Sequence, residues 1–255
     1  MKKFDLFSIL CAVLGCLILL SCGANKAELR QREVALRDLG KQYYVAGDHT
    51  TALRYLLEAE ENYPDDHILQ NYLGQVYLAK NKPEEAIVHF KRAIALKPDY
   101  AVAKNNLGVV YLTQNDWDKA IAVFEELTGD LLYATPHYPL SNLGYAYYQK
   151  QQYAQSEQYY KKALELEPNY PPALRGLGRT YIAMGRDSEA VAALSAAIEQ
   201  YPQFAGAYYD LGRAYLKRKE YRKAKAAFQK VVNLESDSEL GRSARTALQQ
   251  LRYVE

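Results

Sequence analysis

One glycine recurs along this chain at a nearly constant interval, and that interval limits the possible folds more than any other feature. The spacings between successive glycines of the series are 34, 34, 36, 34 and 34 residues. Each glycine follows a leucine and precedes a tyrosine by three residues. The series is Gly40, Gly74, Gly108, Gly144, Gly178 and Gly212. Such a period is typical of repeat proteins, in which each unit buries its apolar faces against the next unit.

Residues 67–100 indicate what one unit folds into. Leu69 and Leu73 begin a series of apolar residues at the spacing of one helical face, and the second half of the unit repeats this spacing. Pro83 separates the two halves, so we expect a helical hairpin. A glycine inside a helix costs about 1 kcal/mol relative to alanine. Gly74 therefore predicts a close approach of the partner helix.

The pattern resembles the tetratricopeptide repeat, a helix-turn-helix unit of about 34 residues. The resemblance implies an all-α fold, a right-handed superhelical solenoid of six repeats followed by a C-terminal capping helix. The expected repeats are 33–66, 67–100, 101–134, 137–170, 171–204 and 205–238, and the capping helix is 239–255. Position 20 of the repeat is alanine in every copy except the fourth, which has Ser156. Ser236 and Glu239 form a capping-box pattern before the last helix.

The N-terminus has the pattern of an export signal. A basic start is followed by an apolar stretch, residues 6–20, of the length of a secretory signal and too short to span a bilayer comfortably. Leu19-Leu20-Ser21-Cys22 resembles a bacterial lipobox. That resemblance implies a lipoprotein signal peptide over 1–21, a covalent lipid on Cys22 and a short linker over 22–32. A rival box ends at Cys16, and an ordinary signal peptide or an uncleaved anchor is the alternative interpretation.

The predicted destination follows from the residue after the lipidated cysteine. Gly23 occupies this place, not the aspartate that retains lipoproteins in the inner membrane of enteric-type bacteria. By that resemblance the chain is expected on the periplasmic face of the bacterial outer membrane, attached to the membrane through its lipid. Several acyl chains, at about 0.8 kcal/mol per buried methylene, give a stable anchor.

Composition and motifs argue against catalysis. The net charge of +2 leaves no electrostatic footprint for nucleic acid. The four histidines show no second ligand at metal spacing, and no phosphate-binding loop or nucleophile motif occurs. We therefore expect a protein that is not an enzyme, with no metal, no cofactor besides the covalent lipid, and no nucleic-acid partner.

The end of repeat three departs from the pattern. Residues 128–139 contain two extra residues, and Leu132 replaces the proline that ends most of the other repeats. Two interpretations stay open, a kink in the array or a partner-facing loop carrying Leu132, Tyr133 and Tyr138. The lipobox, the six repeats and this insertion together are similar to the type IV pilus pilotins, the PilF/PilW/Tgl family. Those outer-membrane lipoproteins help the secretin ring to localise and assemble.

The resemblance also implies a binding groove. In this repeat the first helices line a concave surface, and positions 2, 5, 9, 12 and 13 point into it. We expect the partner-binding residues to be Asn71, Gln75, Asn105, Tyr145, Tyr148, Arg175, Arg179, Tyr209 and Arg213. Asparagines can bond an extended backbone, tyrosines add contact area and arginines receive carboxylates.

Two functional hypotheses follow. The first is a non-catalytic, lipid-anchored pilotin whose partner is a secretin subunit or another pilus assembly component. The alternative is an envelope adaptor that docks peptidoglycan-modifying enzymes or other periplasmic complexes. A cell-wall enzyme is a third and weaker interpretation, because no catalytic motif supports it.

Overall fold

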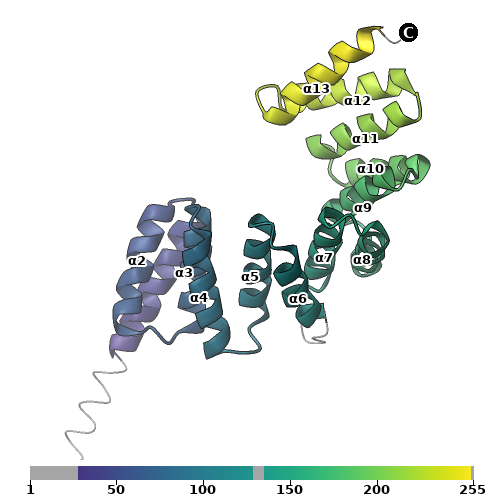
Figure 1. Cartoon of the computed structure of the whole chain (residues 1–255). Coiled ribbons are helices and arrows are strands. Elements are labelled where there is room, and N and C mark those ends of the chain that lie inside the picture. Colours follow the sequence, from purple (N-terminus) through teal and green to yellow (C-terminus); the bar gives the residue numbers. More distant parts are fainter. Residues whose placement is uncertain (1–27, 129–134, 254–255) are drawn as a thin grey trace, which may run out of the picture. The chain divides into compact units, whose positions relative to one another are not determined.

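The computed structural model describes residues 28–128 and 135–253. In these residues every regular element is a helix, and the helices come in consecutive pairs (Figure 1). Residues 28–45 are helical and pair with α2 (His49–Asn62). The following pairs are α3 (His67–Ala79) with α4 (Pro83–Leu96), α7 (His137–Gln149) with α8 (Tyr153–Leu166), α9 (Pro171–Ala183) with α10 (Asp187–Gln200), and α11 (Ala205–Lys217) with α12 (Tyr221–Leu234). Helices α5 (Ala101–Thr113) and α6 (Trp117–Thr128) follow α4 along the chain. The last helix is α13 (Glu239–Gln250), followed by a short 3-10 turn, Leu251–Tyr253.

The prediction of an all-α fold of helical hairpins is confirmed. Helices α3, α5, α7, α9 and α11 each begin at the first residue of an expected repeat. The chain divides into two compact units, residues 1–110 and 111–255, and the boundary falls inside α5. The right-handed winding of the whole array stays a prediction. None of the described helices has the length and apolar character needed to cross a bilayer.

The structure corrects two sequence expectations about element ends. Residues 28–32, expected as linker, are already helical, because Glu, Leu, Arg and Gln are good helix formers and no breaker precedes residue 33. The expected capping serine of α13 was Ser236, but the N-cap is Ser238, whose side chain accepts a hydrogen bond from the Gly241 N–H at 3.0 Å. The predicted lipid site and linker start, Cys22, lies outside the described residues.

The recurring glycine marks the contact between the two helices of a hairpin. A Cβ built on Gly74 would lie 2.6 Å from the ring of Phe90, and one on Gly144 would lie 2.8 Å from the ring of Tyr160. The same relation holds in other repeats, in the pairs Gly40–Leu56, Gly178–Leu194 and Gly212–Phe228. Each partner is position 24 of its own repeat. The predicted close approach of the partner helix is therefore confirmed at these positions.

The recurring tyrosine three residues after each glycine packs against the second helix in one of two ways. Where position 23 is aromatic, the rings stack, as in the Tyr147–Tyr159 pair with centroids 5.2 Å apart. Tyr43–Tyr55 and Tyr77–His89 stack in the same way. In the other repeats a cation lies over the tyrosine ring, in the pairs Lys119–Tyr111, Arg186–Tyr181 and Lys223–Tyr215.

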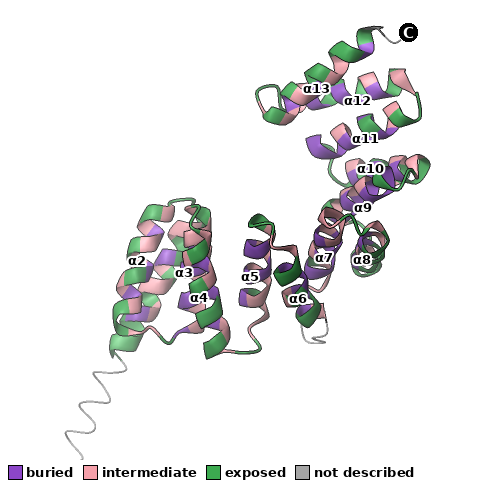
Figure 2. Ribbon diagram, viewed as in Figure 1, coloured by how far each residue is buried: buried purple, intermediate pink, exposed green. Residues whose placement is uncertain are grey.

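The core of each unit is built from small and large apolar residues that face the neighbouring helices, and Figure 2 shows these buried positions along the helix faces. Ser156 is the exception in the alanine series and is fully buried. Its Oγ lies 2.8 Å from the Gly144 carbonyl oxygen and 2.9 Å from Oγ1 of Thr180, which lies 2.9 Å from the Gly176 carbonyl oxygen. The serine therefore belongs to a buried polar contact between repeats four and five.

Candidate protein-binding grooves

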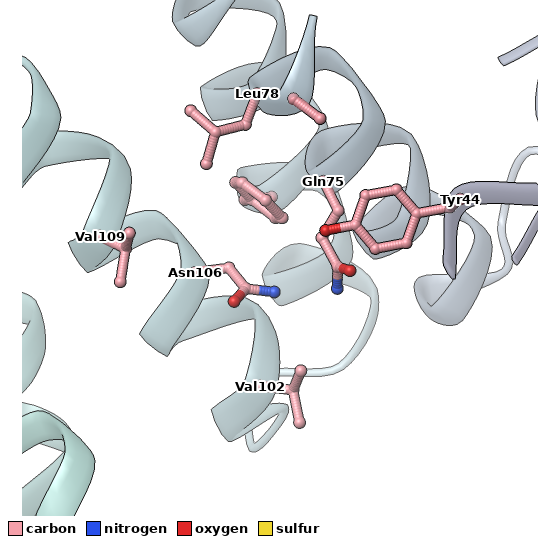
Figure 3. A pocket seen from close by; sticks show the side chains of 8 residues that line it. Tyr44, Gln75, Leu78, Val102, Asn106 and Val109 are labelled. Atoms are coloured by element: carbon pink, nitrogen blue, oxygen red, sulfur yellow. The ribbon is translucent and has the colours of Figure 1, made fainter. Parts of the chain in front are cut away.

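An open groove of about 310 Å³ lies in the first unit. Its floor and walls come from the helix over residues 28–45, from α3 and α4, and from α5. The lining residues are Tyr44, Gln75, Leu78, Ala79, Phe90, Val102, Asn106 and Val109. Figure 3 shows the amides of Gln75 and Asn106 pointing towards each other from α3 and α5. The groove is mostly apolar and carries two amides, which suits the apolar side chains and backbone of an extended peptide.

Three of the predicted binding residues lie in this unit, and they differ in whether their side chains can contact a partner. Gln75 lines the groove. Asn71 is only 2% exposed, and its Oδ1 accepts a hydrogen bond from Nδ2 of Asn106 at 2.9 Å. Oδ1 of Asn105 is buried and has no hydrogen-bond partner among the described residues. Of the three, Gln75 alone lines the groove, while the Asn71 side chain links two repeats.

A second groove, of about 220 Å³, lies in the second unit. It is formed by the first helices α7 and α9, by Tyr160 of α8 and by the residue before α11. The lining residues are Ser141, Asn142, Tyr145, Tyr160, Pro172, Arg175, Gly176, Arg179 and Phe204. The predicted residues Tyr145, Arg175 and Arg179 come together here. This groove is aromatic and basic, in contrast to the apolar groove of the first unit.

The charge of Arg175 is already paired within the protein. Its Nε donates to Oδ2 of Asp210 at 2.7 Å, and its guanidinium lies 5.4 Å from the centre of the Phe204 ring. Asp210 is 2% exposed and also lies 3.5 Å from Nη1 of Arg213. A Cβ on Gly206 would lie 2.7 Å from Cζ of Arg175, so the glycine makes room for the guanidinium. Arg175 therefore joins repeats five and six.

Arg179 has a different environment. Its guanidinium lies over the ring of Tyr148, with Cζ 4.7 Å from the ring centre. Within the part of the chain that the structure describes, no carboxylate is paired with it. Burial raises the pKa of Tyr160, the ring in the wall of this groove, above its ordinary value. That phenol stays neutral, and the charge of the groove comes from the arginines.

The remaining predicted residues are placed as follows. The ring of Tyr209 contacts Phe228 edge-on, and Arg213 is about half exposed beside Asp210. Tyr138 is 42% exposed, and its ring packs against His137 and Tyr170. Leu132 and Tyr133 lie outside the described residues, so the insertion-loop prediction stays a prediction. In the described ranges, no group of three or more His, Cys, Asp or Glu side chains could hold a metal ion.

Sequence reasoning missed the residues at position 6 of the repeat. Asn106 and Asp210 both occupy this position, and each bonds position 5 of the preceding repeat, 35 residues earlier. The signal that could have found them is a complementary pair at that spacing. Asn71 with Asn106 and Arg175 with Asp210 are such pairs.

The family comparison agrees with this architecture. Models of the tetratricopeptide repeat match residues 74–115, 105–132, 147–203 and 188–248, which together make up more than half of the chain. The chain belongs to the tetratricopeptide repeat family. Proteins with this repeat bind protein partners and are generally non-catalytic scaffolds. No curated protein matches this sequence.

Several solved tetratricopeptide repeat structures are similar to this one. PilF of Pseudomonas aeruginosa is 21% identical, with a TM-score of 0.73, and the match covers 88% of this chain and 99% of PilF. PilW, a type IV pilus biogenesis factor, is 21% identical with a TM-score of 0.77, covering 87% and 99%. YrrB, a protein with an unusual peptide-binding site, is 24% identical with a TM-score of 0.54, covering 75% and 97%. At these identities the likeness establishes the fold.

Proposed function

We propose that this tetratricopeptide repeat protein is a pilotin, a lipid-anchored scaffold of the outer membrane that helps a type IV pilus secretin to localise and assemble. The observation that carries the proposal is the length match with PilF and PilW, since 99% of each is covered by this chain. The lipobox ending at Cys22 and the insertion after repeat three support the same assignment.

The proposed mechanism separates anchoring from binding. The lipid on Cys22 keeps the repeats at the periplasmic face of the outer membrane. The grooves of the two units bind a secretin subunit, which raises the local concentration of subunits beside the membrane they must enter. Bound subunits also keep apolar surface away from water until the ring closes.

Anchoring is tested by labelling cells with radioactive palmitate. The native protein should carry label and fractionate with the outer membrane, whereas Cys22→Ser should carry none. Cys16→Ser is the matched control, because it removes the cysteine of the rival lipobox and should leave the label unchanged. Equal labelling of Cys22→Ser and the native protein contradicts the anchor.

Assembly is tested in a strain that lacks the gene. Secretin should then run as monomer rather than as a heat-stable ring on denaturing gels, and twitching should be lost. A normal ring in the deletion strain refutes the pilotin proposal. Co-purification with peptidoglycan-modifying enzymes in place of secretin would identify the chain as the alternative, an envelope adaptor.

A further inference from the structure

We propose that the groove of the second unit recognises an acidic side chain, Asp or Glu, inside an extended segment of its partner, and that Arg179 receives this carboxylate. The inference rests on the proposed function in one respect, because it assumes that the groove binds a polypeptide. It adds the chemistry of the bound segment and the residue that selects it.

The first argument compares two arginines of repeat five that both lie over a tyrosine ring. Arg186 lies 4.4 Å from the centre of the Tyr181 ring, donates to Oε2 of Glu157 at 2.6 Å, and is also paired with Glu189. Arg179 has the equivalent ring, Tyr148, but among the described residues it has no carboxylate. A planar guanidinium held on a ring presents its forked N–H donors to a carboxylate with little further loss of side-chain freedom. Carboxylates of the chain itself bind Arg186, whereas no carboxylate of the described residues binds Arg179.

The second argument is the charge balance of the groove. Two arginines line the groove, Arg175 and Arg179, and in the described part of the chain Asp210 is the one carboxylate paired with either of them. Asp210 is almost fully buried and bonded to Arg175. The groove therefore keeps a positive excess at the partly exposed Arg179, which favours a segment of negative charge.

The third argument concerns the position of Arg179 within the groove. It lies on α9, and α9 packs against both α7 and α11. Tyr145 of α7 and Phe204, the residue before α11, line the groove, and Tyr148 of α7 lies under the Arg179 guanidinium. A carboxylate at Arg179 thus has binding surface on both sides. This geometry suits an acidic side chain within a segment that passes through, whereas the end of a chain would leave one side empty.

The aromatic residues favour an extended segment with apolar or aromatic neighbours to the acid. Tyr145 and Phe204 line the groove, and the hydroxyl of Tyr145 accepts a hydrogen bond from Nε2 of Gln149 at 2.7 Å. Such rings give contact area at low entropic cost. The expected ligand is therefore an acidic residue flanked by apolar or aromatic ones.

The test uses the full-length chain in detergent and immobilised pools of eight-residue peptides, acetylated at the N-terminus and amidated at the C-terminus. Each pool has Glu, Gln or Lys fixed at one central position and mixed residues elsewhere. Binding is measured by biolayer interferometry. The native protein should bind the Glu pool about tenfold more tightly than the Gln pool. Raising the salt concentration from about 0.05 M to about 0.5 M should reduce this preference, because a partly exposed ion pair is screened.

Arg179→Gln should abolish the preference, so that the Glu and Gln pools bind with equal affinity. Arg222→Gln is the control, because it removes the same charge from an exposed position of α12 and should keep the preference. Circular dichroism of each variant checks that the repeats remain folded.

The outcomes separate the inference from the proposed function. Equal binding of the Glu and Gln pools by the native protein overturns the inference and leaves a protein-binding scaffold intact. A matched set of pools with a free C-terminal carboxylate is measured alongside, and binding to that set alone overturns the inference in favour of a chain-end receptor. No binding to any pool overturns both the inference and peptide binding by this groove.

Discussion

Gly74 and Phe90 lie in contact across the second hairpin, with the ring so close that a methyl group on the glycine would sit 2.6 Å from Cε1 of the ring. Phe90 is fully buried and also lines the groove of the first unit, so a methyl group at residue 74 would have to displace this ring. The glycine of the repeat is therefore a packing requirement, although it weakens the helix that contains it.

Gly74→Ala should destabilise the first unit. Alanine would gain about 1 kcal/mol of helix propensity, but overpacking a buried site costs about 1–3 kcal/mol. We expect a net loss of about 1 kcal/mol in the free energy of unfolding, measured by urea titration with circular dichroism. A variant more stable than the native protein contradicts the packing argument.

Gly241→Ala should detach α13 from the second unit. A Cβ at this position would lie 1.9 Å from the carbonyl oxygen of Glu235, a backbone atom that cannot turn away. We expect the free energy of unfolding to fall by about 3 kcal/mol. Rapid hydrogen exchange should be confined to α13. Gly185→Ala is the control, since no atom lies within 4 Å of its Cβ and only its positive φ of 74° opposes the change. Equal effects of the two substitutions would argue against the clash.

Ser156 and Thr180 should show coupled energies in a double-mutant cycle. Their two hydroxyl hydrogens serve three short contacts, to each other and to two carbonyl oxygens. Ser156→Ala and Thr180→Val should each lower the free energy of unfolding by about 1 kcal/mol. The double variant should differ from their sum by about 0.5–1 kcal/mol, because the two hydroxyls share two hydrogens among three contacts and removing one changes which bonds the other can make. Strict additivity would mean that the two hydroxyls do not interact.

Asp210→Asn should separate the roles of the two groove arginines. The substitution removes the nearly buried carboxylate that pairs with Arg175. We expect the free energy of unfolding to fall by about 2 kcal/mol. Arg179→Gln should change the stability by less than about 1 kcal/mol, because it breaks no ion pair among the described residues and loses only the contact with the Tyr148 ring. Thermal unfolding of both variants measures this difference. A larger loss in Arg179→Gln would make Arg179 a structural residue.

The first unit should lose stability as the pH falls below about 6.5, the ordinary pKa of histidine. Burial lowers the pKa of His89 in the folded state, Arg92 lowers it further, and Glu60 and Glu85 oppose this change. The Gln70 amide nitrogen donates to Glu60 and to the Pro64 carbonyl, so its Oε1 faces His89 Nδ1 at 2.8 Å and accepts from it.

The sign follows from the proton count. The unfolded chain takes up a proton near pH 6.5 and the folded chain only at lower pH, so the free energy of unfolding decreases with falling pH between those values. His89→Asn keeps an N–H for Gln70 and cannot titrate, so its stability should vary less between pH 7 and about pH 5. Urea titrations at several pH values give, for each protein, the slope of the free energy of unfolding against pH. Equal slopes for the two proteins would contradict the role of His89.

The sequence by itself determined the hairpins, their register and the reason for the recurring glycine. Period, helix breakers and one-faced apolar spacing are local properties, and a small residue at a fixed position in every copy shows where two helices must touch. The helices accordingly begin at the expected residues of five repeats.

Only the tertiary structure decided which polar residues are free to bind. Asn71 and Arg175 occupy the same repeat position, and both bond a residue 35 positions later in the next repeat. Arg179, one turn further along α9, has no such partner among the described residues. The repeat pattern places all three on the first helices. Their pairing depends on which side chain the neighbouring repeat brings within hydrogen-bond distance, and that is a property of packing between repeats rather than of spacing within one.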